Sequence, residues 1–421
     1  MRSLKFGTTW KVYEKVAFRF LFVLFTGFIL FFNNGAIPVL MPVSYLFSLV
    51  SLELVSWVGQ YIFSVPDEIG MSRNGSGDTT YHFLLLFCVL VISIVTTVVW
   101  SILDRGRQSY NSMYYWLTAL VRFYVGLMLI QYGFAKFWGG QFPAPDVVRL
   151  GQSYGDSSPM GLAWTFFGYS DGYKWFMAIA ELSGALLLFR RTMTAGAFIA
   201  LGTTLNIMAV NYFFDVPVKI VSTALVVMCL FLLFIHFRQL FRFFFLGKLV
   251  RLPVIPEPFF QKSWQLYTKR AAKALMVIWT LALCGATIVH SKKRYEARNN
   301  SSGLFGSHQV VEFNSQSEKA THWKELRLAN SSTATLLYRN GASLECMYAA
   351  DTVRRTLELY IKGPAEDTDV FTYEVGDNGQ LELRGSHNGI PVSVTLRKTE
   401  PADFTLMKTG FRWVNEGPYN R

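Results

Sequence analysis

Long apolar segments recur along the first 290 residues of this 421-residue chain, and they limit its possible folds more than any other feature. A helix of about 20 mostly apolar residues crosses a bilayer core. Segments close to this length are residues 17–32, 81–102, 115–138, 173–189, 194–214, 217–237 and 271–290. Charged residues make up only 16% of the chain, whereas soluble domains average about 25%. The sequence therefore predicts an α-helical membrane bundle of about seven transmembrane helices.

Basic residues are concentrated between alternate helices, which indicates the orientation of the bundle. Residues 1–20 contain five Lys or Arg residues, and residues 238–273 contain eight against the single carboxylate of Glu257. Because Lys and Arg accumulate on the cytoplasmic side, we predict a cytoplasmic amino terminus and, after seven crossings, an extracytoplasmic C-terminal region. Residues 238–251, rich in Phe and Arg, predict an amphipathic segment beside anionic lipid. These inner segments account for the net charge of +12 without a nucleic-acid partner.

Two further segments on the predicted outer side are more than simple loops. Residues 37–65 are apolar but contain Pro38, Pro42 and Glu53, which predicts an interfacial or re-entrant helix. The alternative is an eighth spanning helix, which would invert every later loop and place the basic turns outside. Residues 139–172 are rich in Gly, Pro, Tyr and Ser, and they predict a structured lid over the outer ends of the helices.

The composition changes after about residue 291, where 17 basic residues are balanced by 16 acidic ones. Short alternating runs precede or follow turns such as Asn340-Gly341 and Asn388-Gly389, a pattern typical of β-hairpins. We predict an antiparallel sheet or small sandwich there. The predicted domains are 1–114 with the first helices, 115–237 with a four-helix core, 238–290 with a basic segment and the last helix, and 291–421 with the β domain.

The cysteine and histidine residues do not have the spacing of a redox or metal site. Cys88, Cys229, Cys284 and Cys346 lie far apart with no Cys-x-x-Cys pair. The C-terminal histidines, His308, His322 and His387, also lack the spacing of metal ligands. We therefore expect no metal site, and no catalytic residue is assigned.

Ionisable residues inside the apolar segments are costly, at about 2.5–3.5 kcal/mol each on insertion scales, so each needs a partner or a purpose. Arg122 and Lys136 are fourteen residues apart on one helix face, with Gly126 and Gly133 between them to allow close helix contact. Glu181 lies on the following helix. Counting about 1.5 Å per residue places Arg122 and Glu181 at similar depth. The sequence predicts that they form a buried ion pair, which fixes helix order or, less simply, takes part in catalysis.

A second polar group collects at the predicted outer ends of the helices. Its members are Lys136, Asn206, Asn211, Asp215 and Lys219. They predict a site for the polar head of a quinone-like or lipid ligand, because many aromatic residues surround them. An aromatic belt at the membrane interface, with the opposite charges binding each other, is the alternative.

The same helices resemble the DoxX-like integral membrane proteins. The resemblance rests on the helix LVRFYVGLMLIQYGFAKFWGG, the helix AELSGALLLFRR, the stretch NIMAVNYFFDVPVKIVS and, more weakly, the tail GFRWVNEGPYNR. It covers roughly residues 115–237. It implies a four-helix bundle in the bacterial cytoplasmic membrane, in a family whose members are in some cases linked to thiosulfate:quinone oxidoreduction or to thiol-redox complexes.

Three functions follow from these patterns. The first is a redox-associated membrane subunit that binds a quinone-like or lipid molecule at the outer polar residues. The second is a non-catalytic membrane scaffold whose outer β domain docks a partner protein. The third, transport, is the weakest because the sequence shows no inverted repeat. Motifs for nucleotide or phosphate chemistry are absent from the sequence.

Overall fold

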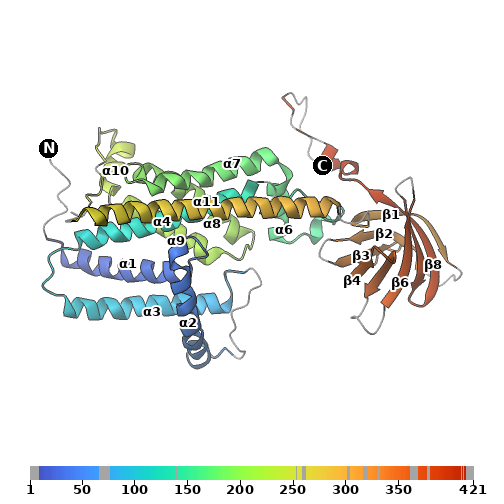
Figure 1. The fold of residues 1–421 in the computed structure, drawn as a ribbon, viewed down its shortest axis with the longest axis horizontal. Coiled ribbons are helices and arrows are strands. Elements are labelled where there is room, and N and C mark those ends of the chain that lie inside the picture. The colour runs from blue at the N-terminus through green and yellow to red at the C-terminus, as the bar shows by residue number, and fades with distance from the viewer. Residues whose placement is uncertain are drawn as a thin grey trace. The chain divides into compact units, whose positions relative to one another are not determined.

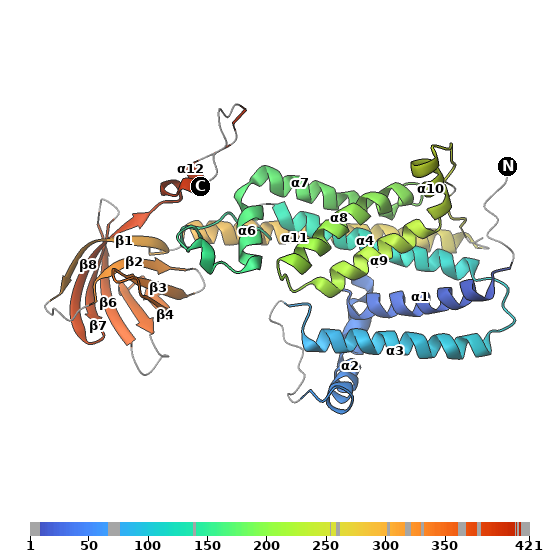
Figure 2. The same cartoon turned by 180° about the vertical axis from the view of Figure 1, so that it is seen from behind.

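The computed structural model divides the chain into two compact units. Described are residues 9–65, 76–137, 140–252, 254–257, 262–300, 304–315, 321–329, 332–360, 368–376, 380–408, 410 and 412–413, with the backbone alone for 294–300. Met1–Phe142 and Pro159–Ser291 form one unit, here called the helical unit. Pro143–Ser158 and Lys292–Arg421 form the other, here called the barrel unit (Figures 1 and 2).

The helical unit is built mainly from long helices, with a few shorter ones between them. They are α1 (Val12–Phe31), the short 3-10 helix η1 (Pro38–Leu40), α2 (Met41–Tyr61), α3 (Thr80–Leu103), α4 (Asn111–Lys136), α6 (Pro159–Tyr169), α7 (Asp171–Leu182), the 3-10 helix η4 (Ser183–Leu188), α8 (Met193–Phe213), α9 (Lys219–Phe234), α10 (Phe237–Leu246) and α11 (Ser263–Asn300). The residues of α11 after Ser291 group with the barrel unit. Figures 1 and 2 show α1, α3, α4, α7, α8, α9 and α11 following roughly one direction. We call the two ends of this unit the Tyr110 end and the Lys136 end, after the residues at the start and finish of α4.

Among the described residues, five helices are long and apolar enough to cross a membrane, where the sequence predicted about seven. They are Pro38–Tyr61, Thr80–Leu103, Asn111–Lys136, Met193–Phe213 and Ser263–Lys293. The pair α9 and α10 adds a sixth if it counts as one span, but it is bent by 84°. α1 falls short because it contains Glu14, Lys15 and Arg19, and α7 has only 12 residues. These helices make the chain a multi-pass membrane protein.

α2 differs from the other long helices in its course. Figures 1 and 2 show it lying across α1 and α3. Its surface carries many exposed apolar side chains, among them Tyr45, Leu46, Leu49, Val50, Trp57 and Tyr61. By length and composition α2 is a candidate span. The interfacial or re-entrant helix and the eighth spanning helix therefore both stay open for residues 37–65.

α4 is the central helix of the unit, and small residues let its neighbours approach closely. A Cβ atom on Gly126 would lie 2.9 Å from the carbonyl oxygen of Gly184, and one on Gly133 would lie 3.0 Å from that of Ala178. These contacts pair α4 with η4 and α7 in antiparallel order, because position numbers rise on one helix as they fall on the other. The close contact predicted from Gly126 and Gly133 is confirmed.

The barrel unit contains eight antiparallel strands that close into a barrel, where the sequence predicted an antiparallel sheet or sandwich. The strands are β1 (Gly306–Ser315), β2 (Trp323–Leu328), β3 (Thr333–Tyr338), β4 (Ser343–Asp351), β5 (Thr356–Tyr360), β6 (Thr368–Val375), β7 (Gln380–His387) and β8 (Ile390–Thr399). Antiparallel order is confirmed. The closure comes from pairing of β1 with β8, as between Phe313 and Val394. Register shifts in β1 and β2 add local bends that help closure.

Apolar side chains fill the interior of the barrel. Fully buried are Trp323, Leu326, Leu328, Leu336, Leu357, Leu359, Phe371, Leu383, Val394 and Leu396. An eight-stranded barrel has an interior just wide enough to be packed in this way. Gly341 has a φ of +87°, and Asn388 and Gly389 have φ values of +52° and +74°. The predicted Asn-Gly turns are therefore present, since such turns need positive φ.

The segment predicted as one lid, residues 139–172, is divided between the two units. Residues 143–158 contain α5 (Val147–Leu150) and the 3-10 helix η3 (Tyr154–Asp156), and they group with the barrel. Gly151 lies against the guanidinium group of Arg327. A Cβ atom on Gly151 would be 3.1 Å from Cζ of Arg327. The Asp377-Asn378-Gly379 turn and most of the 410–421 tail lie outside the described residues.

Candidate functional site

A buried ion pair joins α4 to α7. The Nζ atom of Lys136 lies 2.8 Å from Oε1 and 2.7 Å from Oε2 of Glu181. It also donates to Oε1 of Gln141 over 2.9 Å. Only 6% of the Lys136 side chain and 3% of the Glu181 side chain are exposed. The three ammonium protons therefore have acceptors, and the pair is closed to solvent.

The antiparallel packing of α4 and α7 brings these two side chains together. Helical side chains lean toward the N-terminus of their own helix. Lys136, on the last turn of α4, leans toward the Tyr110 end, and Glu181, near the end of α7, leans toward the Lys136 end. The ring of Phe142 lies 5.4 Å from Nζ of Lys136 and covers the pair on another side.

The predicted ion pair between Arg122 and Glu181 is wrong. Nε of Arg122 donates to the carbonyl oxygen of Leu187 over 2.8 Å, so the guanidinium leans toward the Tyr110 end, away from Glu181. The depth count failed for a second reason. η4 is a 3-10 helix and rises about 2.0 Å per residue, against about 1.5 Å for an α-helix. Its six residues move Glu181 by roughly 3 Å toward the Lys136 end.

Asp78 and the predicted polar residues hold the turn between α8 and α9. Oδ2 and Oδ1 of Asp78 accept hydrogen bonds from the backbone nitrogens of Lys219 and Ile220 over 2.6 and 3.0 Å. They thereby cap the start of α9. Nδ2 of Asn211 donates to the carbonyl oxygen of Val218 over 3.2 Å. Asp215 and Lys219 form an ion pair of 2.9 Å whose Asp215 side chain is 82% exposed.

The structure does not gather the five predicted ligand residues into one site. Lys136 is enclosed with Glu181, while Asn206 is exposed on α8. In the described parts of the chain, no hydrogen bond or ion pair joins Lys136 to Asn206, Asn211, Asp215 or Lys219. Asp78, which sequence reasoning missed, organises the turn instead.

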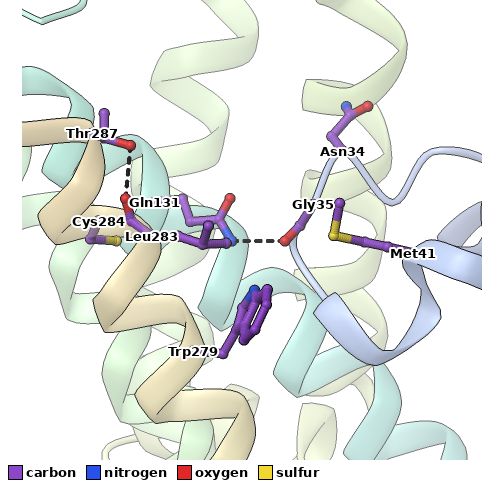
Figure 3. A pocket seen from close by; sticks show the side chains of 8 residues that line it. All are labelled: Asn34, Gly35, Met41, Gln131, Trp279, Leu283, Cys284 and Thr287. Atoms are coloured by element: carbon purple, nitrogen blue, oxygen red, sulfur yellow. Dashed lines mark hydrogen bonds between the residues drawn. The ribbon is translucent and has the colours of Figure 1, made fainter. Parts of the chain in front are cut away.

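A pocket of about 260 Å³ lies beside the turn between α1 and α2. Its lining comes from that turn, from α4 and from α11, and consists of Asn34, Gly35, Met41, Gln131, Trp279, Leu283, Cys284 and Thr287. Figure 3 shows the α11 residues facing Gly35 and Met41, with Gln131 between the two sides. Met41 is 47% and Trp279 53% exposed, so the pocket reaches the surface of helices that are candidate membrane spans.

Hydrogen bonds fix the shape of this pocket. Nε2 of Gln131 donates to the carbonyl oxygen of Gly35 over 3.1 Å. The side-chain amide of Asn33 bonds to the backbone of Ile37 in both directions, which closes the turn. Asn34 and Gly35 have positive φ values of +46° and +79°. Sequence reasoning named the amides Asn206 and Asn211 but overlooked Gln131, although a lone amide inside an apolar helix is an equally clear signal.

The barrel unit contains a buried chain of hydrogen bonds at one end of its strands. Nε2 of His387 lies 2.9 Å from the hydroxyl of Tyr338, and Nδ1 lies 2.5 Å from Oδ2 of Asp369. The backbone nitrogen of Asn388 donates to Oδ1 of Asp369 over 2.9 Å. Burial, and then the charge of Asp369, raises the pKa of Tyr338 to about 12. The chain holds His387 in one orientation and links β3, β6 and β7.

The four cysteines are all free and buried. Burial, and then the charge of Asp369, raises the pKa of the Cys346 thiol to about 11. Over the described residues, no group of three or more His, Cys, Asp or Glu side chains is arranged to hold a metal ion.

Comparison with known proteins gives one informative match, to a protein named "Uncharacterized protein YwoB" from Bacillus subtilis (strain 168). The two sequences are 35% identical over 141 residues, which is 32% of this chain and 88% of the Bacillus protein. No family model matches the chain, and no solved structure matches it. Because the match takes in most of the Bacillus protein at this identity, the chain belongs to the same family as YwoB.

Proposed function

We propose that this chain is a DoxX-like membrane protein that binds a quinone-like or lipid ligand in the pocket between the α1–α2 turn, α4 and α11, as a redox-associated subunit. The observation that carries the proposal is the pocket itself, in which the ring of Trp279 and the amide of Gln131 line a space of about 260 Å³. Ligand pockets usually combine an apolar wall with a few fixed polar groups.

The pocket is a better ligand site than the outer polar residues predicted from sequence. Lys136 already binds Glu181 and Gln141, so a ligand head group would have to displace a buried partner. Among the described residues that line the pocket, no ion pair has to be broken before a ligand can bind. The exposed faces of Trp279 and Met41 would let a ligand enter from the lipid and leave its tail among the acyl chains.

The arrangement of α4, α7 with η4, α8 and α9 supports the DoxX-like part of the proposal. These elements pack on one another in sequence, α4 against α7 and η4, and α8 against η4 and α9. That is the packing expected of a four-helix core. Arg122 and Glu181, two of the charged residues in the resemblance, hold two of its contacts.

We also propose that the Tyr110 end is cytoplasmic in a bacterial inner membrane. Arg190 and the basic residues of 238–273 all belong to this end of the helical unit, as the positive-inside rule requires. The crossing segments would then be α1, whose charged residues all lie in its first half, α3, α4, α7 with η4, α8, α9 and α11. The crosswise α2 would lie along the outer interface. A reporter enzyme that folds to an active form only outside the cytoplasm should therefore be active when it is fused after residue 421.

The ligand proposal is tested by mass spectrometry of organic extracts from the purified full-length protein. Trp279→Ala and Gln131→Leu alter the pocket, while Trp264→Ala, on an exposed part of α11, is the matched control. A quinone or defined lipid that is present in wild type and control but lost in both pocket variants supports the proposal. Equal retention in every variant contradicts it, and loss on Asp215→Ala alone would move the site to the α8–α9 turn.

The scaffold function is the second candidate, because the interior of the barrel is filled by side chains. A barrel of this kind acts through its outer surface, which suits the docking of an extracytoplasmic partner. The expected result is a partner that co-purifies with the full chain and is lost when residues 291–421 are deleted. A protein with unchanged partners after this deletion would exclude this role for the barrel.

A further inference from the structure

Two basic side chains bind one carboxylate at the Tyr110 end of the helical unit, and two more lie close to one of them. Nη2 of Arg190 lies 2.9 Å from Oε2 of Glu257, and Lys269 forms a second ion pair with the same carboxylate. The positive charges of Arg122, Arg190 and Lys273 lie close enough to Lys269 to repel its ammonium group. We call these four basic residues and Glu257 the basic cluster. They come from α4, the turn before α8, residues 254–257 and α11.

Further contacts seen among the described residues orient the cations of the cluster through uncharged groups. Nζ of Lys273 donates to the carbonyl oxygen of Leu188 over 2.7 Å and lies 4.2 Å from the ring of Phe189. Arg122 donates to the carbonyl oxygen of Leu187. Nζ of Lys269 donates to the hydroxyl of Tyr115 over 2.8 Å. Carbonyl oxygens and aromatic rings orient a cation, whereas only an anion cancels its charge.

The sequence around the cluster offers no second carboxylate. Glu257 is the sole acidic residue in 216–295, and neither 105–145 nor 182–214 contains Asp or Glu. The cluster thus combines four positive charges with one negative charge. Arg122, Lys269 and Lys273 belong to helices that are candidate membrane spans, where an uncompensated charge is costly. An anion from outside the chain would offset this cost.

The neighbouring α10 indicates where such an anion is found. α10 turns by 84° from α9, so it lies across the direction of the spanning helices. Phe237, Phe241 and Phe245 are exposed on it, beside Arg238 and Arg242. A helix with this composition rests in the headgroup region with its rings among the acyl chains. The Arg190 side chain remains 37% exposed, and it can therefore be reached from that region.

We infer that the basic cluster binds the phosphate of an anionic phospholipid headgroup. Arg190, Lys269 and Lys273 donate to the phosphate oxygens, Arg122 adds its charge from behind, and Glu257 competes with the lipid for the same cations. Basic pockets between helices on the cytoplasmic side suit headgroups of this charge. The inference does not depend on the ligand pocket of Figure 3, which is lined by other residues.

Native mass spectrometry of the full-length protein, released from mixed micelles of phosphatidylglycerol and phosphatidylcholine, tests the inference. Arg190→Gln and Lys273→Gln should each lower the retention of phosphatidylglycerol about fivefold, since one basic residue near a membrane surface contributes about 1 kcal/mol. Arg191→Gln is the matched control, because it removes the same charge from the adjacent exposed position. Glu257→Gln should raise retention, because it removes the competing carboxylate.

The Glu257 variant separates a lipid site from a purely structural cluster. If the ion pairs only stabilise the fold, Glu257→Gln lowers thermal stability in neutral detergent without any gain in phosphatidylglycerol, and the inference is overturned. Equal retention of both lipids by all variants also overturns it. A parallel titration with inorganic phosphate distinguishes the source: displacement of the lipid at millimolar phosphate would assign the cluster to soluble phosphate instead.

Discussion

Lys136 and Glu181 bind each other through both carboxylate oxygens of Glu181, at 2.8 and 2.7 Å, inside the contact between α4 and α7. Each side chain is almost fully enclosed. Removing one member of a buried pair leaves an uncompensated charge, whereas replacing both leaves none. The pair is therefore expected to behave as a unit.

Lys136→Ala and Glu181→Ala should each lower the free energy of unfolding by about 3–5 kcal/mol, because each strands the partner's charge. The double variant Lys136→Met with Glu181→Leu should recover most of this loss. Denaturant unfolding of the full-length protein in micelles measures all three. If neither single substitution lowers the free energy of unfolding, the charge that remains has found another partner or water, and the prediction is contradicted.

Gly126→Ala should destabilise the protein by about 1–3 kcal/mol, because its Cβ would lie 2.9 Å from the carbonyl oxygen of Gly184 and force α4 away from η4. Gly202→Ala on α8 is the matched control, since no atom lies within 4 Å of its Cβ position. The same unfolding measurement should leave this control unchanged or slightly more stable. Similar losses for both variants would point to a cause other than helix contact.

Asp78→Ala should loosen the start of α9, because the backbone nitrogens of Lys219 and Ile220 lose their acceptor. A lost cap costs about 1 kcal/mol, or roughly a fivefold gain in hydrogen exchange at these two amides. Asp215→Asn should have almost no effect, since its ion pair with Lys219 is largely exposed and Asn tolerates the φ of +51° found at this position. Equal exchange in both variants would contradict the capping role.

Cys346 should resist alkylation until the solution is strongly basic. Its pKa is raised from 9 to about 11 by burial and then by Asp369, and only the thiolate reacts. At pH 8 we expect modification at least about 100-fold slower than for a free cysteine, with the rate rising up to about pH 11. Folding raises this pKa, so the contribution of the Cys346 thiol to the free energy of unfolding is fully present below pH 9. That contribution is lost as the pH rises from 9 to 11, because the unfolded chain then releases the thiol proton first.

Peptide mass spectrometry after timed alkylation of the intact wild-type protein measures the rate at which Cys346 reacts. Asp369→Asn should increase the reactivity of Cys346 at a given pH, since it removes a negative charge that disfavours the thiolate. Fast alkylation at pH 8 in the native protein would show that Cys346 is accessible and unperturbed.

The sequence allowed the architecture to be predicted wherever local pattern decides it. Apolar segments indicated the long helices, and Gly126 and Gly133 indicated a close helix contact. Asn340-Gly341 and Asn388-Gly389 marked two hairpins correctly. These features depend on residues that are near each other along the chain.

Contacts that depend on the orientation of side chains, or on elements far apart in the sequence, could not be predicted in the same way. The partner of Glu181 was misassigned because its choice depends on the lean of side chains on antiparallel helices and on the 3-10 geometry of η4. The pairing of β1 with β8 joins strands about 80 residues apart, which no local pattern records. Gln131 and Asp78 were missed because a single amide or carboxylate shows its role only when its backbone partners are placed.

The pairing of β1 with β8 has a consequence for how this unit meets other proteins. A sheet edge with unpaired backbone groups invites strands from other chains, and this is a common route to aggregation or to binding by strand addition. The eight described strands leave no such edge, because the first and last pair with each other. Any partner of the intact barrel must therefore recognise its side chains and loops, and a chain truncated before β8 would expose β1 and β7 to foreign strands.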